Sequence, residues 1–109
     1  LGMIGASELG GMKPTAYLIN VARGPLVDYN ALFEALTNNK IAGAAFDVFW
    51  SEPAPSDDPI LRLENFFISP HVAGFSDVSI EHITNIMAEN FRRLASGKPL
   101  VNVIDPANR

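Results

Sequence analysis

The sequence predicts an α/β fold built on a parallel sheet. Three short segments that are typical of strands, residues 17–21, 41–49 and 66–69, alternate with segments of helical character. The first of them, YLINV, is apolar nearly throughout, as strands buried on both faces of a parallel sheet are. The order strand, helix, strand, short turn, strand, long helix favours parallel pairing. Three strands are few for such a sheet, so we expect half of a doubly wound domain.

The elements around the first strand are indicated by their capping residues. Ser7 is the expected cap of a short helical turn over residues 8–12. After the strand at 17–21, Asp28 is placed to cap a helix over residues 29–38. The apolar residues of this helix recur on one face: Leu32, Phe33 and Leu36.

The second strand, 41–49, contains small residues that let a neighbouring backbone approach closely: Gly43, Ala44 and Ala45. Residues 51–59 read as a loop, and residues 58–63 as a single helical turn. The third strand, 66–69, ends at Pro70, because proline cannot donate to a ladder.

A long amphipathic helix is predicted over residues 77–95 and ends near Gly97 and Pro99. Its apolar stripe is interpreted as core or interface: Ile80, Ile83, Met87, Phe91 and Leu94. Residues 99–104 are expected to be extended, and the tail 105–109 is polar.

Composition excludes several classes of protein. The chain has 109 residues and a net charge of −4, which argues against nucleic-acid binding. It has no cysteine, so disulfides, thiolate metal sites and a cysteine nucleophile are excluded. We expect no metal site, no membrane span and no signal peptide, and a cytoplasmic location. The sequence begins in mid-pattern at Leu1, which suggests a piece of a longer protein.

Polar side chains follow each predicted strand. Arg23 lies just past the first strand, Asp47 near the end of the second with Glu52 five residues on, and His71 after the third. Ligands of open α/β sheets bind beyond the carboxyl ends of the strands. An arginine fork suits a carboxylate, and a histidine beside a carboxylate suits proton transfer. The set favours carbonyl/alcohol chemistry on an acid substrate, with the hydride supplied by a cofactor.

Three motifs carry a family resemblance: NVARGPLVDYNALFEAL, AGAAFDVFWSEP and NFFISPHVAG. They resemble, in order and spacing, the carboxy-terminal part of the D-isomer specific 2-hydroxyacid dehydrogenases, which include D-3-phosphoglycerate dehydrogenase and glyoxylate/hydroxypyruvate reductase. The resemblance implies that residues 1–75 are the carboxy-terminal half of a Rossmann-type NAD-binding domain with the catalytic loops. Residues 76–109 would be the long helix and tail that return to the substrate domain.

The resemblance also implies roles for individual residues. Arg23 would bind the substrate carboxylate, His71 would be the acid/base, and Glu52 would support it. Asp47 would contact the nicotinamide carboxamide. Asn20, Val21 and Ala22 would line the nicotinamide side of the cleft, and Gly74 would lie near its carboxamide. His71 is also expected among the residues that bind the cofactor. The cofactor would be NAD, with NADP as the open alternative. Trp50 is expected to narrow the pocket.

The function expected is that of a fragment of an NAD(P)-dependent oxidoreductase that interconverts D-2-hydroxy acids and 2-keto acids. No G-x-G-x-x-G follows a strand in the sequence, so we expect the 109-residue piece alone to be inactive. Two alternatives stay open: an NAD-sensing co-repressor of the same fold, and an inactive structural fragment. The exposed face of a half sheet predicts a homodimer or a swapped oligomer.

Overall fold

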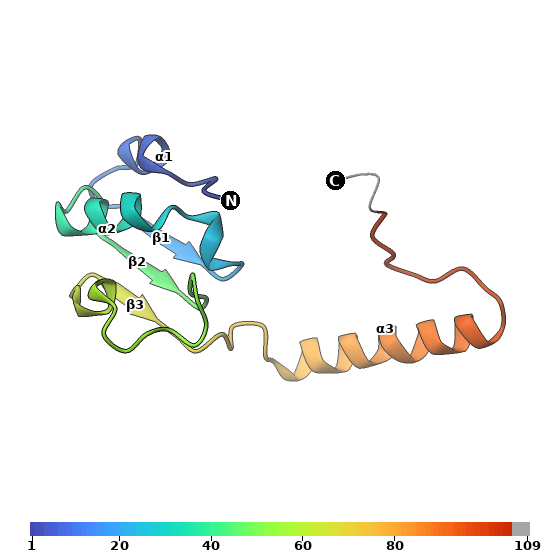
Figure 1. Ribbon diagram of the computed structural model, residues 1–109. Helices are drawn as coiled ribbons and strands as arrows, with labels where there is room; N and C mark the ends of the chain where they lie inside the picture. The colour runs from blue at the N-terminus through green and yellow to red at the C-terminus, as the bar shows by residue number, and fades with distance from the viewer. Residues whose placement is uncertain (106–109) are drawn as a thin grey trace. The chain divides into compact units, whose positions relative to one another are not determined.

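The computed structural model describes residues 1–105 (Figure 1). The chain forms two compact units, one from Leu1 to Ala73 and a second that begins at Gly74. The first unit contains the sheet and the loops that follow its strands. The second unit contains the long helix.

The sheet has three parallel strands in the order β1-β2-β3, and their arrows in Figure 1 point the same way. They are β1 (Tyr17–Asn20), β2 (Gly43–Phe46) and β3 (Phe66–Ile68). The predicted parallel α/β arrangement is therefore confirmed. β2 is shorter than the predicted 41–49, because β1 and β3 end opposite Phe46 and leave the following residues no ladder to join.

Close packing of the strands depends on a glycine at the start of β2. A Cβ added to Gly43 would lie 2.8 Å from the carbonyl oxygen of Asn65 and 3.0 Å from the ring of Tyr17. The prediction that small residues here admit a neighbouring backbone is confirmed at this position.

Two helices belong to the first unit, α1 (Ala6–Gly10) and α2 (Tyr29–Thr37). Asp28 caps α2 as predicted, and its side chain accepts a hydrogen bond of 2.8 Å from the backbone N–H of Ala31. The prediction that Ser7 caps α1 is wrong, because Ser7 lies inside the helix. The helix begins earlier since the side chain of Glu8 reaches back 2.9 Å to the N–H of Gly5, the residue in the cap position.

The hydrophobic core lies on one face of the sheet, where α2 packs. Its largest fully buried side chains are Leu9, Leu32, Leu36, Ile41, Phe46, Val48 and Ile60. The other face is bare within the first unit: Tyr17, Ile19 and Phe67 are each more than 60% exposed. The first strand was predicted to be buried on both faces, and within this unit it is buried on one face only. The reason is that the buried side chains of α1 and α2 all belong to the core on that single face.

Two single turns of 3-10 helix complete the first unit, η1 (Gly24–Leu26) and η2 (Pro59–Arg62). The second confirms the predicted turn over 58–63. Asp58 caps it and accepts a 2.6 Å hydrogen bond from the hydroxyl of Tyr29. Burial and this carboxylate raise the pKa of Tyr29 to about 12. Asp58 therefore has a structural role.

The second unit is built on α3 (Asp77–Ala95), which has the predicted bounds. Ser76 caps it, and the predicted apolar stripe is exposed within this unit. Asn90 brackets Val101 with hydrogen bonds of 3.2 and 2.9 Å to its carbonyl and N–H. The segment predicted to be extended bends here, and Asn102 has a φ of +56°. Apart from Asp105, the predicted polar tail lies outside the described residues.

No helix within residues 1–105 combines the length and the apolar character needed to cross a bilayer.

Candidate active site

Arg23 stands in a tight turn that directly follows β1. The side chain of Asn20 spans this turn: its Nδ2 donates to the carbonyl of Arg23 at 2.9 Å, and its Oδ1 accepts from the N–H of Ala22 at 3.0 Å. Asn20 is only 6% exposed, so its own side chain is shielded from water, whereas Ala22 and Arg23 are exposed. The side chain of Arg23 is exposed, and one Nη1 donates to the carbonyl of Ala22 at 2.6 Å. The guanidinium has five donors, so most remain for a ligand.

The turn that carries Arg23 is packed directly on the loop that carries Glu52. Gly24 makes this contact and is buried. A Cβ added to Gly24 would lie 2.7 Å from the backbone nitrogen of Trp50 and closer still to the carbonyl group of Phe49. Only glycine fits here, since any side chain would push the two backbones apart.

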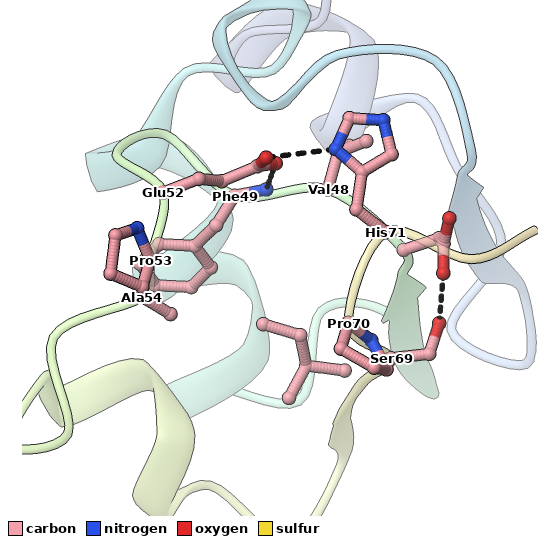
Figure 2. A pocket seen from close by; sticks show the side chains of 10 residues that line it. Val48, Phe49, Glu52, Pro53, Ala54, Ser69, Pro70 and His71 are labelled. Carbon is pink, nitrogen blue, oxygen red and sulfur yellow. Dashed lines mark hydrogen bonds and ion pairs between the residues drawn. The ribbon is translucent and has the colours of Figure 1, made fainter.

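Glu52 and His71 form a close pair (Figure 2). His71 Nδ1 lies 2.8 Å from Oε2 of Glu52, and the other carboxylate oxygen accepts a 2.9 Å hydrogen bond from the N–H of Phe49. The hydrogen bond with His71 is the main cause that holds the pKa of Glu52 below its ordinary value of 4.5. The Phe49 N–H and the positive charge of Arg23 lower it further.

The ionised carboxylate of Glu52 fixes the tautomer of the histidine. A carboxylate can only accept, so Nδ1 of His71 carries the proton and donates to it. The atom of the ring that is left for chemistry is Nε2. Both side chains are a little under half exposed, so a ligand can reach them.

Asp47 is buried at the end of β2 and binds the segment that carries His71. It is 4% exposed. Its Oδ1 accepts from the hydroxyl of Ser69 at 2.5 Å and from the N–H of Val72 at 2.9 Å, and its Oδ2 accepts from the N–H of Ala73 at 2.7 Å. The bond from Ser69 is the largest cause that lowers the pKa of Asp47, so the side chain is a carboxylate at neutral pH.

A cavity of about 530 Å³ opens beside the Glu52–His71 pair. Its lining, shown in Figure 2, is Asp47, Val48, Phe49, Glu52, Pro53, Ala54, Ile68, Ser69, Pro70 and His71. Arg23 is not part of the lining; it lies on the neighbouring turn, close enough for its charge to act on Glu52. The structure therefore gathers Asp47, Glu52 and His71 at one edge of the sheet, with Arg23 next to them.

Trp50, which was expected to narrow the pocket, does not line this cavity. Its indole N–H donates to the carbonyl of Val27 at 2.7 Å. Its ring stacks on Phe46 and meets Tyr29 edge-on. The side chain is held in the core by these contacts.

The remaining predicted cofactor residues lie in two places. Val21 and Ala22 are exposed, and Val21 lines a smaller hollow with Asp47, Ser69 and Ala73 at the carboxyl end of the sheet. Gly74 begins the second unit, where its carbonyl accepts a 2.6 Å hydrogen bond from the hydroxyl of Ser79.

Sequence reasoning missed Ser69. The only available signal was a hydroxyl at the end of a strand, two residues before the histidine. Among residues 1–105, no three His, Asp or Glu side chains are grouped so that they could hold a metal ion.

Comparison with known proteins gives a consistent result. Residues 1–73 match the family model described as D-isomer specific 2-hydroxyacid dehydrogenase, NAD binding domain. Among curated relatives, the chain is 43% identical over 103 residues to a glyoxylate reductase of Korarchaeum cryptofilum, covering 94% of this chain and 31% of the relative. It is 36% identical over 105 residues to a D-3-phosphoglycerate dehydrogenase of Archaeoglobus fulgidus, covering 96% of this chain and 20% of the relative.

A similar solved structure is the D-isomer specific 2-hydroxyacid dehydrogenase of Xanthobacter autotrophicus in complex with NADPH and MES. The two sequences are 37% identical, and the TM-score is 0.86. The matched region covers 98% of this chain and 43% of that protein's chain. The chain thus spans less than half the length of these relatives. The parallel sheet with its helices is part of a Rossmann-type NAD-binding domain, and the chain belongs to the D-isomer specific 2-hydroxyacid dehydrogenase family.

Proposed function

We propose that the protein containing this chain is an NAD(P)-dependent oxidoreductase that interconverts D-2-hydroxy acids and 2-keto acids. The observation that carries the proposal is the 2.8 Å pairing of His71 with Glu52 beside the cavity, with Arg23 on the adjoining turn. A proton donor, its carboxylate partner and a carboxylate-binding cation are the groups that reduction of a 2-keto acid requires.

Each residue has a defined part in this chemistry. The nicotinamide cofactor, when bound, supplies the hydride for the carbonyl carbon of the substrate. Arg23 holds the substrate carboxylate through two parallel hydrogen bonds. His71 gives the proton on Nε2 to the carbonyl oxygen as negative charge develops there, and takes it back in the oxidation. Glu52 keeps Nδ1 protonated and stabilises the cationic ring.

The residues present are suited to the nicotinamide part of the cofactor. The smaller hollow, which is also lined by Ile19 and Phe67 of the bare sheet face, is mostly apolar, with Asp47 as its one ionisable group. A carboxylate has about four acceptor positions and Asp47 uses three, so one remains for a carboxamide N–H. Asn20 uses both ends of its amide within its own turn, so we assign it support of the turn and leave the cofactor to Val21, Ala22, Asp47 and Gly74.

The decisive experiment is a panel of 2-keto acids with NADH and with NADPH, using the whole protein that carries these residues. His71→Ala should lower turnover by roughly 10²-fold to 10⁴-fold while cofactor binding is kept. His82→Ala is the matched control, because His82 is the second of the two histidines and is exposed on α3. Turnover by the His71→Ala protein at the wild-type rate would refute the proposal.

We also propose that the 109-residue chain alone is inactive and associates with itself through its bare apolar sheet face. The first part rests on the absence of a G-x-G-x-x-G cradle from the sequence. The second rests on the exposure of Tyr17, Ile19 and Phe67. Sedimentation of the chain at high concentration as a monomer would contradict the second part.

A further inference from the structure

The segment that carries His71 has a backbone conformation that is unfavourable unless contacts from other parts of the structure stabilise it. His71 has a φ of +56°, in the left-handed region that residues other than glycine seldom adopt. Its N–H donates to the carbonyl of Ser69 at 3.0 Å, which closes a very tight turn. Such a conformation persists only where the surroundings fix it, and this one sits at the base of the imidazole.

The side chain of Asp47 supplies that fixation. It accepts from Ser69 before the histidine and from Val72 and Ala73 after it, so its three hydrogen bonds enclose His71 in the sequence. Asp47 is itself tied to the sheet, because its N–H donates to the carbonyl of Asn20 at 3.0 Å. The position of the turn is thereby set relative to the strands.

The hydroxyl of Ser69 is the only side-chain donor of the three. Its 2.5 Å bond to Oδ1 is short and involves a charged acceptor, which makes it one of the stronger kinds of hydrogen bond. The two other donors are backbone N–H groups, which side-chain substitutions other than proline leave in place. Ser69 is therefore the member of the set whose contribution can be removed by mutation without changing Asp47.

We propose that Ser69, through Asp47, is a positioning residue that holds the 69–73 turn so that His71 meets Glu52 and presents Nε2 to the substrate. This inference deepens the proposed function and rests on it for the identity of the proton that is moved. Ser69 lines the cavity, but its hydroxyl is bound to Asp47, and the proposed chemistry gives it no part in proton or hydride transfer.

Removal of the hydroxyl is expected to act on turnover rather than on binding. Ser69→Ala leaves Oδ1 with one donor, and the turn gains freedom at the end nearest β3. A displacement of about 1 Å at a catalytic group costs up to roughly 10²-fold, so kcat should fall about 10-fold to 100-fold. The substrate carboxylate is assigned to Arg23, so KM for the keto acid should change little.

The experiment compares three variants in the whole protein. Ser69→Ala removes the hydroxyl, and Ser69→Thr keeps it and should restore kcat. Ser56→Ala is the control, because Ser56 is an exposed loop serine outside the cavity lining. Kinetics are combined with amide hydrogen exchange of Val72 and Ala73, and with the NMR titration of the His71 ring against His82. The charged groups near the His71 ring are Glu52, which is hydrogen-bonded to it, and Asp47, and the charge of Arg23 acts on Glu52.

The expected result is faster exchange at Val72 and Ala73 and an altered ring titration in Ser69→Ala, both restored in Ser69→Thr and absent in Ser56→Ala. Wild-type exchange and wild-type titration in Ser69→Ala would overturn the positioning role. A wild-type protein that reduces no 2-keto acid would count against the proposed function alone, since the exchange and titration data decide on the turn independently.

Discussion

Gly24 offers the sharpest test of how the site is assembled. In Gly24→Ala the new Cβ would lie 2.7 Å from the backbone nitrogen of Trp50 and closer to the Phe49 carbonyl. Ordinary contact begins at 3.4 Å, so the two loops must separate by at least about 0.7 Å. The atoms that clash are backbone atoms and cannot rotate away. The substitution therefore moves Arg23 relative to Glu52.

The expected effect has two parts. Overpacking of this kind costs about 1–3 kcal/mol of unfolding free energy, which lowers Tm by several degrees. Misplacement of the carboxylate clamp by most of an ångström lowers kcat/KM by roughly 10-fold to 100-fold. The assays are thermal unfolding of the whole protein and steady-state kinetics with the keto acid that it reduces best.

Gly10→Ala is the matched control. Gly10 is the last residue of α1, and a Cβ added there meets nothing within 4 Å. That variant should keep wild-type Tm and kcat/KM. If Gly24→Ala behaves like Gly10→Ala in both assays, the close contact between the two loops does not set the geometry of the site, and the reasoning fails.

Three further predictions concern the side chains of Glu52 and Asn20. Glu52→Gln should lower kcat about 10-fold or more, because an amide no longer stabilises the cationic ring; Glu64→Gln, on an exposed loop residue, is its control. The pKa of Glu52 is lowered on folding, so its stabilising effect is present above pH 4.5 and is lost as the pH falls through the lowered value. In urea unfolding measured from pH 7 to pH 3, the free energy of unfolding of Glu52→Gln should therefore decrease less than that of the wild type. An equal decrease would contradict a lowered pKa of Glu52. Asn20→Ala leaves the N–H of Ala22 without its partner and removes one of the two donors to the carbonyl of Arg23, which costs about 1–3 kcal/mol and should raise KM for the keto acid more than it lowers kcat. Asn30 lies on the exposed surface of α2, so Asn30→Ala should change neither KM nor kcat. Equal kinetics for the two variants would show that the hydrogen bonds of the Asn20 side chain do not determine substrate binding.

The elements of the fold could be predicted because each has a local signal. Asp28 caps α2 as predicted, the apolar residues of α3 recur at helical spacing, and the apolar runs of the three strands are bounded by polar or turn residues. The gathering of Glu52 and His71 at one edge could also be predicted, because parallel strands deliver the residues after them to the same side of a sheet.

What could not be predicted depends on loop backbone that no periodicity encodes. The left-handed φ of His71 and the enclosure of its turn by Asp47 require the relative position of two loops. The same is true of Trp50, whose ring turns to the core because the Val27 carbonyl lies within reach of its N–H. The cap of α1 was misplaced because glutamate three residues after Gly5 supplies the bond that a serine was expected to make.

The bare face of the sheet links the stability of this unit to whatever covers it. Ile19 and Phe67 are exposed by 69% and 63%, and removing each from water would stabilise the folded state by about 1–2 kcal/mol. Those amounts are comparable with a large part of the net stability of a small domain. A surface that covers this face would thus influence how often the strands separate. The loops that carry Arg23, Glu52 and His71 follow the ends of those strands, so they would be affected as well. The residues that the proposed chemistry uses therefore depend on whatever covers this face, and two of its exposed side chains, Ile19 and Phe67, also line the smaller hollow that is proposed for the nicotinamide.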